Sequence, residues 1–413
     1  MYLSTLDRNR TAGGPVRAVG GTVLALGAVS LVTDVSAEMV TAILPLYLVV
    51  GLQFSPAAYG VIDGLYTGAT VLLRLVGGYV GDRVNRHKTV AGLGYGMSAF
   101  AKLGLLAAGA SGPLIGLMIT ADRAGKGLRT APRDALITLA TPQDRLGRAF
   151  GVHRTMDATG AFLGPIATLA VLALGNGAFG PVFVTSFCVA LLAVLILVLF
   201  VPAAAGPRPR PAEVSWRAVA RLGRGRLLPA ACLLGLVTIG DGFVYLVLQR
   251  RVELGIGWFP ILAVGTSLVY LLLAAPLGRL ADRIGRLWVF AGGNALLAAV
   301  YLLLYGPLGG LPLVVTVLAL YGTFYAATDG VLMALAGSVF PPELRATGMA
   351  LVQSGQALAY SVSSVLFGLA WQTWGAGAAC LAAAVAALLA LPLTVFLLTK
   401  ESRSLSARAH VSS

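Results

Sequence analysis

The chain has 413 residues, of which 58% are hydrophobic and only 11% are charged. An average globular protein carries roughly 25% charged residues, so this composition cannot supply a soluble surface. It predicts an integral membrane protein whose surface faces lipid. The formal net charge of +14 does not indicate a nucleic-acid partner, because the basic residues are scattered between hydrophobic runs and form no patch with aromatic residues.

The sequence offers few residues for metal, cofactor or covalent chemistry. Cys188, Cys232 and Cys380 lie in separate apolar stretches without paired spacing, so neither a disulfide nor a metal site is expected. The chain has three histidines and lacks a nucleotide-binding loop of the Gly-x-x-x-x-Gly-Lys-Ser/Thr type. We therefore expect no enzyme, no ATP-driven machine and no cofactor.

Apolar runs divide the chain into helices. A helix crosses the membrane core with about 20 apolar residues. Twelve such runs are found at 20–50, 56–80, 88–110, 113–140, 149–174, 180–203, 227–249, 257–280, 287–305, 312–339, 347–371 and 375–398. Alternate connections carry Lys or Arg, whereas those near 51–56, 110–113, 174–181, 305–312 and 371–376 contain neither. Because basic loops stay in the cytoplasm, we expect both termini to be cytoplasmic; Arg250 and Arg251 are the exception to the pattern.

The longest connection, 204–226, places Trp216, Val219 and Leu222 on one face of a helix and arginines on the other. This pattern is typical of an amphipathic helix at a membrane surface. The connection separates an N-terminal six-helix bundle at 1–203 from a C-terminal six-helix bundle at 227–399, which is followed by a polar tail at 400–413. The expected fold class is an all-α membrane protein with twelve transmembrane helices in two bundles.

The two halves repeat each other at an offset of 200 residues. The segment Gly78-Tyr79-Val80-Gly81-Asp82-Arg83-Val84-Asn85-Arg86 corresponds to Gly278-Arg279-Leu280-Ala281-Asp282-Arg283-Ile284-Gly285-Arg286. The same offset relates Pro142-Gln143-Asp144-Arg145 to Pro342-Glu343-Leu344-Arg345. A duplicated six-helix unit predicts two pseudo-symmetric bundles that rock about a site at the membrane midplane.

These residues carry a resemblance to a known family. The repeated Gly-x-x-x-Asp-Arg-x-x-Arg element resembles the signature of the major facilitator superfamily of transporters, of the twelve-helix type, with Asn85 where the family usually has Gly. Arg123-Ala124-Gly125-Lys126-Gly127 is similar to the family's Arg-x-x-Gln-Gly motif. Gly151, Gly160 and Gly164-Pro165 resemble the motif of the proton-driven exporter branch, with Thr168 and Leu169 in place of its terminal Gly pair.

The resemblance implies a secondary active transporter that works by alternating access. The function that we expect is proton-coupled efflux of a small organic molecule by a monomer in the plasma (inner) membrane, with substrate, protons and membrane lipid as partners. The alternative is a proton symporter or facilitated importer of a small anionic or zwitterionic solute. A transport-inactive sensor or scaffold is a further alternative, which an uptake assay would decide.

Ionisable residues inside predicted spans indicate a cavity, because an isolated charge at the bilayer centre costs at least about 2.5–3.5 kcal/mol. The resemblance puts the helices at 20–50, 113–140, 227–249 and 312–339 around the central cavity. The candidates for proton coupling or the substrate cavity are Asp34, Glu38, Asp122, Arg123, Lys126, Arg129, Asp241 and Asp329. Asp34 is the first choice for the proton carrier, with Arg123 as the cation that changes its proton affinity. Pairing of Asp122 with Lys126, or of Asp34 with Arg123, would instead make these residues structural.

Further candidates lie in neighbouring helices. The 149–174 helix carries His153 and Asp157, one turn apart, as a proton relay or an interhelical hydrogen-bonded pair, and Gly160, Gly164 and Pro165 for close packing and a bend. Asp63 lies in the 56–80 helix, and Arg74 and Lys102 are expected to extend towards an interface.

The resemblance also implies a cytoplasmic gate. It places Asp82 near the start of the 347–371 helix and Asp282 near the start of the 149–174 helix, where a helix N-terminus stabilises a carboxylate. The gating candidates are Asp82, Arg83, Arg86, Asp282, Arg283 and Arg286.

Overall fold

The computed structural model describes residues 20–84, 86–142, 145–202, 225–340 and 345–411, which fold into helices without a strand. The helices of the first half are α1 Gly21–Thr41, α2 Leu44–Leu46, the π-helical turn η1 Tyr47–Gly51, α3 Pro56–Val84, α4 His87–Ala107, α5 Gly112–Leu139, α6 Leu146–Leu174 and α7 Phe179–Phe200. Those of the second half are α9 Leu227–Val237, α10 Asp241–Val252, the 3-10 turn η3 Ile256–Trp258, α11 Pro260–Ile284, α12 Arg286–Tyr305, α13 Gly310–Val339, α14 Arg345–Trp374 and α15 Ala376–Val411.

These elements confirm the all-α fold class and the twelve helical segments. Two segments are broken where the sequence predicted continuous helices: α1 is followed by α2 and η1, and α9 is separated from α10 at 238–240. The residues from 400 onwards, predicted as a polar tail, continue α15 to Val411. The predicted amphipathic helix at 204–226 lies almost entirely outside the described residues.

Among the described segments, nine are long and apolar enough to cross a membrane. Over their described residues, α5 and α14 are less apolar than these nine. Both pack against α3, α5 from the same half and α14 from the other half. This arrangement is expected, because polar and charged side chains in a membrane protein face the protein interior instead of lipid.

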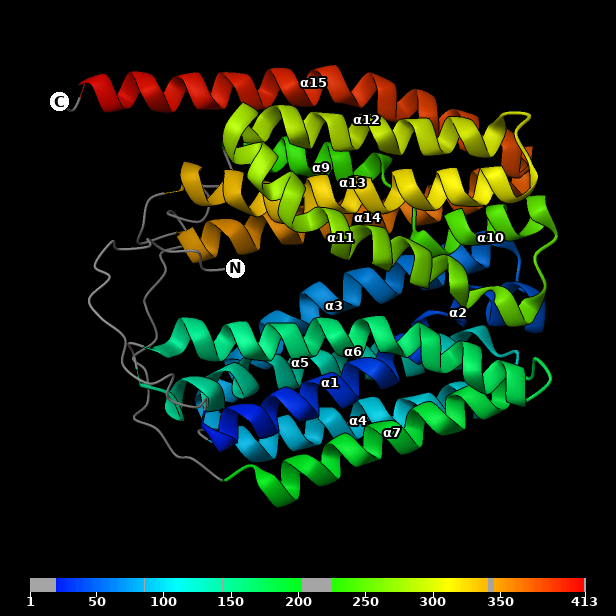
Figure 1. The fold of residues 1–413 in the computed structure, drawn as a ribbon, viewed down its shortest axis with the longest axis vertical. Helices are drawn as coiled ribbons and strands as arrows, with labels where there is room; N and C mark the ends of the chain where they lie inside the picture. The colour runs from blue at the N-terminus through cyan, green and yellow to red at the C-terminus, as the bar shows by residue number, and fades with distance from the viewer. Residues whose placement is uncertain (1–19, 85, 143–144, 203–224, 341–344, 412–413) are drawn as a thin grey trace.

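The helices form two bundles that lie side by side (Figure 1). In the first, α1 packs against α6 and α7, and α4 packs against α5 and α7; in the second, α13 packs against α11 and α12, and α14 packs against α9. The bundles meet where α14 contacts α3, α11 contacts α6 and α10 contacts α2. Figure 1 shows the bundles closest at the end that carries α2 and α10 and farther apart at the opposite end.

Glycines allow α3 and α14 to touch across the boundary between the bundles. A Cβ atom added at Gly64 would lie 2.7 Å from the carbonyl oxygen of Ser361, and one added at Gly368 would lie 2.5 Å from the carbonyl oxygen of Pro56. Such distances require glycine, as is common where membrane helices approach closely. The two bundles are therefore in backbone contact at the end of the molecule that carries α2 and α10.

Candidate functional site: a cavity between the bundles

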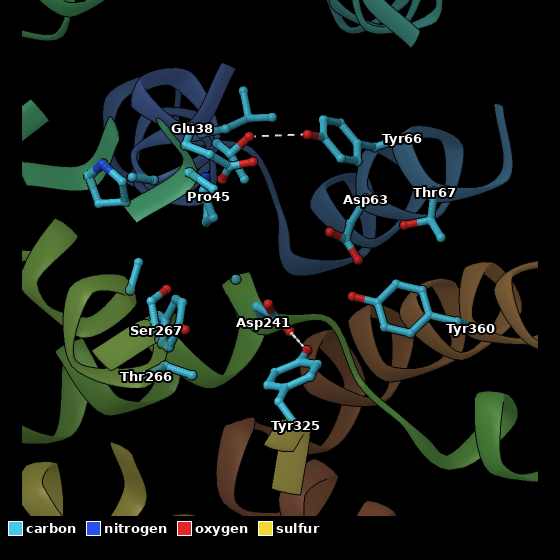
Figure 2. Close-up of a pocket in the computed structure, with 18 of the residues that line it drawn as sticks. Glu38, Pro45, Asp63, Tyr66, Thr67, Asp241, Thr266, Ser267, Tyr325 and Tyr360 are labelled. Atoms are coloured by element: carbon cyan, nitrogen blue, oxygen red, sulfur yellow. Dashed lines mark hydrogen bonds between the residues drawn. The ribbon is translucent and has the colours of Figure 1, made fainter. Parts of the chain in front are cut away.

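A cavity of about 550 Å³ lies between the two bundles. The first bundle contributes residues of α1, α2, α3 and α6 to its wall, and the second contributes residues of α10, α11, α13 and α14. Figure 2 shows Glu38, Asp63 and Tyr66 on one side and Asp241, Tyr325 and Tyr360 on the other. The volume is within the range of roughly 300–1,000 Å³ that is usual for small-molecule sites.

Four carboxylates line this cavity. Glu38 and Asp63 come from the first bundle, and Asp241 and Asp329 come from the second. Among the described residues of the wall there is no Lys, Arg or His. The cavity is therefore acidic unless protons or a ligand neutralise it.

The breaks in the first and seventh segments position two of the carboxylates. Glu38 lies in the last turn of α1, just before the break, and Pro45 follows in α2. Asp241 is the first residue of α10, after Gly240 in an extended conformation (φ −61°, ψ 141°). Broken helices in corresponding positions of the two halves are characteristic of substrate sites in transporters, and the free N–H groups at the start of a helix stabilise a carboxylate.

Hydroxyl groups donate hydrogen bonds to three of the carboxylates. Ser364 Oγ donates to Asp63 Oδ2 (2.5 Å), which joins the two bundles. Tyr321 OH donates to Asp241 Oδ1 (2.7 Å), and Tyr325 OH donates to the same oxygen. Tyr270 OH lies 3.4 Å from Asp329 Oδ2. Uncharged donors, and not cations, thus hold these side chains in position.

Aromatic side chains make up much of the remaining wall. Its six tyrosines are Tyr59, Tyr66, Tyr245, Tyr270, Tyr325 and Tyr360. Tyr59 packs edge to face on Phe243 of the other bundle, with ring centroids 4.7 Å apart. The cavity therefore combines negative charge with aromatic surface.

The structure separates the predicted cavity residues into two groups. Glu38, Asp241 and Asp329 line the cavity. The described wall does not include the other five, which are Asp34, Asp122, Arg123, Lys126 and Arg129. Asp122, Arg123 and Arg129 are buried within the first bundle, where Arg123 also lies over the ring of Tyr66 at 3.9 Å from its centroid.

The predicted ion pairs inside the first bundle differ from those observed. Asp122 pairs with its neighbour Arg123 and accepts a hydrogen bond from Ser98 of α4, so its partner is not Lys126. Asp34 lies 4.0 Å from Arg129 Nη2, so its partner is not Arg123. Helical spacing gives the face on which a residue lies but not the rotation of neighbouring helices, and the rotation decides which side chains meet.

Lys102 is also placed differently from the expectation. Its side chain does not extend towards an interface, because the residue is only 2% exposed and Nζ donates to Ser36 Oγ at 2.5 Å. Ser36 is in turn hydrogen-bonded to Ser186 of α7. The ammonium group therefore joins α4 to α1 and α7. The side chain of Arg74 lies outside the described part of the structure.

The residues predicted in the 149–174 helix lie where α6 faces α1 and α5. His153 is 1% exposed, and its Nε2 has no hydrogen-bond partner among the described residues. Asp157 accepts a hydrogen bond from Ser30 of α1 (2.7 Å) and lies 3.9 Å from Arg133. Gly160 contacts the backbone of α1.

Gly164 and Pro165 complete this region of α6. A Cβ atom at Gly164 would lie 2.5 Å from that of Glu38, so the glycine makes room for the carboxylate. Pro165 lies within the helix and lines the cavity. Close packing of α6 on α1 therefore brings this part of the motif to the wall of the site.

Part of the predicted gate falls within the described side chains. Asp282 is exposed and lies 3.4 Å from Arg286, one turn along the chain. Arg283 and Arg86 are also exposed. The side chains of Asp82 and Arg83 lie outside the described part of the structure.

Sequence reasoning did not assign Asp63 or the tyrosines to the cavity. A signal was present, because Tyr59, Asp63 and Tyr66 follow one another at steps of four and three and therefore share one helix face. Tyr321, Tyr325 and Asp329 do the same on α13 at steps of four.

Two helix bundles around one central cavity are an arrangement typical of membrane transporters. The model of the Major Facilitator Superfamily matches residues 26–259 and 251–412. An uncharacterized MFS-type transporter of Methanocaldococcus jannaschii is 28% identical over 366 residues, which cover 86% of this chain and 90% of the relative. An uncharacterized protein of Mycobacterium tuberculosis is 33% identical over 159 residues, 38% of each chain.

Solved structures share the fold. The nucleoside transporter NupG superposes with a TM-score of 0.76 at 14% identity, covering 91% of this chain and 98% of that one. A POT family transporter in complex with 5-aminolevulinic acid superposes with a TM-score of 0.77 at 13% identity, covering 92% and 96%. The chain belongs to the major facilitator superfamily, a class of multi-pass membrane transporters and not of enzymes.

Proposed function

We propose that this transporter exports a small organic molecule in exchange for protons, as a monomer in the plasma (inner) membrane. The observation that carries the proposal is the cavity, in which carboxylates of both bundles face one space that contains no basic side chain among its described wall residues. Ionisable residues inside a membrane protein mark proton and substrate paths. A carboxylate that binds either a proton or a substrate group makes the two compete, and this competition is what exchange requires.

The orientation of the chain is part of the proposal. Connections with clustered arginines, such as those containing Arg86 and Arg283, are assigned to the cytoplasm, together with both termini. With that orientation the contact between α3 and α14 closes the external side, and the bundles diverge towards the cytoplasm (Figure 1). This inward-facing arrangement is the state in which an exporter loads its substrate. Residues 1–203 and 227–399 are the two moving units, and 204–226 links them.

Glu38 is the proton carrier in this proposal. It lines the cavity at the break after α1, and the charges of Arg123 and Lys126 on α5 act on it electrostatically. A local shift of α1 within the first bundle, at the break that follows Glu38, would change that interaction and with it the affinity of Glu38 for a proton. Asp34, the first choice from sequence, lies outside the described wall beside Arg129, so the role passes to Glu38.

The glycine–proline motif of α6, formed by Gly151, Gly160, Gly164 and Pro165, favours export over import, because it resembles the motif of the proton-driven exporter branch. Its Gly160 packs against Leu31 and its Gly164 against Glu38, both on α1. The motif thus couples α6 directly to the segment that carries the proposed proton site. A change in the packing of α6 on α1 would therefore change the position of the Glu38 side chain.

A gradient experiment in proteoliposomes tests the proposal. Purified protein is reconstituted, vesicles are loaded with a panel of cationic, neutral and anionic organic solutes, and an inward proton gradient is imposed. An exporter that exchanges protons should empty the vesicles of its substrate, whatever its orientation in the bilayer. Accumulation of substrate in the vesicles under the same gradient would instead identify a proton symporter. A substrate flux that does not depend on the proton gradient would identify a facilitated carrier.

A further inference from the structure

Three of the four carboxylates of the cavity form no ion pair with a described cation. Among the described side chains, no salt bridge involves Asp63, Asp241 or Asp329. Arg123 and Lys126 act electrostatically on Glu38, but Arg123 is already paired with Asp122. When ionised, Asp63, Asp241 and Asp329 therefore carry negative charge that no described ion pair balances.

Asp63 and Asp241 face each other from opposite bundles. The carboxylate of Asp63 lies close to Gly240, the residue before Asp241. A Cβ atom added at Gly240 would lie 3.1 Å from Asp63 Cγ. Both carboxylates line the same cavity. A positive group placed between them would bind both bundles at once and relieve their repulsion.

Aromatic rings surround this pair of carboxylates. The side chains of Tyr325 and Tyr360 lie beside Asp241 and Asp63 in the close-up of the cavity (Figure 2). Tyr325 lines the cavity, and its OH donates a hydrogen bond to Asp241. Ring faces attract organic cations, and cages of aromatic residues recognise quaternary ammonium groups.

Size and ligand type argue against a bare metal ion. The cavity of about 550 Å³ is large enough for a drug-sized molecule. Within the part of the chain that the structure describes, no group of three or more His, Cys, Asp or Glu residues is arranged to hold a metal. The positive charge that the cavity accommodates is therefore expected on an organic molecule.

We infer that the substrate is an organic cation whose charged centre is held between Asp63 and Asp241 and whose body packs on the surrounding tyrosines. The inference rests on the proposed function only in taking this cavity as the substrate site. It departs from the anionic or zwitterionic solute considered from the sequence, because the basic residues of α5 that suggested such a solute lie outside the described wall.

Two ions of the same shape and opposite charge test the inference. Tetraphenylphosphonium and tetraphenylborate are titrated against the purified full-length protein in lipid nanodiscs, with empty nanodiscs as the background. Saturable binding is expected for the cation and not for the anion. Asp63→Asn and Asp241→Asn are each expected to weaken cation binding roughly ten- to hundredfold, because each amide removes one Coulombic attraction to the phosphonium centre.

Matched variants separate lost charge from lost folding. Asp241→Glu keeps the charge and is expected to retain most of the binding. Glu253→Gln removes an exposed acidic side chain at the end of α10, outside the cavity wall, and is expected to leave binding unchanged. Size-exclusion profiles and unfolding temperatures establish that each variant is folded.

Three results would overturn the inference: no saturable binding of tetraphenylphosphonium, binding of tetraphenylborate that is equal or tighter, or unchanged cation binding in folded Asp241→Asn. None of these results would decide the outcome of the gradient experiment, because that experiment can detect the export of a substrate of any charge. Conversely, charge-selective binding without gradient-driven flux would leave the cation site standing and remove the proposal of proton-coupled export.

Discussion

The two acidic side chains of α1 have different surroundings although they lie one helical turn apart. Asp34 lies 4.0 Å from Arg129, within the charge network of the first bundle. Glu38 lines the cavity next to Gly164 and Pro165 of α6. A proton that drives exchange must reach the space in which substrate binds, and of these two residues only Glu38 is in the described wall of that space.

Replacing each acid by its amide tests this difference. Glu38→Gln is expected to reduce gradient-driven transport to background while substrate counterflow continues, because the amide keeps the size of the side chain but cannot release a proton. Asp34→Asn is expected to retain gradient-driven transport. Both fluxes are measured in the same proteoliposomes. Loss of coupling in Asp34→Asn, with coupling intact in Glu38→Gln, would show that Asp34 and not Glu38 is the proton carrier.

The sequence indicates which helices carry buried charges but not which side chains meet. Asp34, Arg123 and Arg129 are all visible as charges in apolar segments, yet the observed partner of Asp34 is Arg129. Lys102 was expected near an interface because its stem is long, but it is buried and its ammonium group donates a hydrogen bond to Ser36 Oγ. These outcomes depend on the rotation of packed helices, which small residues such as Gly94 and Gly125 set by close contact between α4 and α5.

At the scale of elements, the twelve segments could be predicted because each leaves a strong signal in hydropathy and loop charge. The breaks at 42–43 and 238–240 could not be predicted with the same rule, since an apolar run looks continuous whether or not its backbone is helical. Pro45 and Gly240 are the local signals of these breaks. Both breaks adjoin cavity carboxylates, so the departures from regular helix fall at the proposed site.

In the proposed orientation, closure of the external side depends on the contact between α3 and α14. A leucine at Gly64 would meet the backbone of Ser361, where a Cβ atom alone already lies 2.7 Å from the carbonyl oxygen. Gly64→Leu is therefore expected to separate the bundles at the external end and to lower the inward-facing population. Gly96→Leu is the matched control, because a Cβ atom there has open space.

Spin-label distances report this separation. Labels at the exposed residues Ala107 of α4 and Trp374 of α14 measure the distance between the external ends of the two bundles. The native cysteines Cys188, Cys232 and Cys380 are first replaced by alanine. The distance should lengthen in Gly64→Leu and stay constant in Gly96→Leu. An unchanged distance in folded Gly64→Leu would remove the closing role of this contact.

At the scale of the whole molecule, the cytoplasmic ends of the bundles must approach each other when the external ends part. Asp282 is exposed, with its carboxylate 3.4 Å from Arg286, in the arrangement described here. In the proposed outward-facing state it reaches the start of a helix in the other bundle and holds the cytoplasmic side shut, by the charge–dipole interaction that helix N-termini offer.

Asp282→Asn tests this gate. The neutral side chain loses a charge–dipole interaction of about 0.3–1 kcal/mol, which corresponds to a roughly two- to fivefold shift towards the inward-facing population. Labels at Thr89 of α4 and Trp288 of α12, both exposed, should then report longer cytoplasmic distances. Glu253→Gln, at the other end of the molecule, is the control. A distance distribution identical to that of the unmodified protein would contradict the gate.

The coupling of export to protons is tested most directly by the sign of a pH change inside sealed vesicles. Proteoliposomes containing pyranine and benzyltrimethylammonium, a permanent organic cation, are diluted into the same buffer without benzyltrimethylammonium. Only the outward gradient of this organic cation then drives exchange. Each cation that leaves should admit protons, and the lumen should acidify in the unmodified protein but not in Glu38→Gln. An alkaline lumen would show that cation and proton leave together, and a constant lumen pH during protein-dependent efflux would show that they are uncoupled; either result would contradict proton-coupled export.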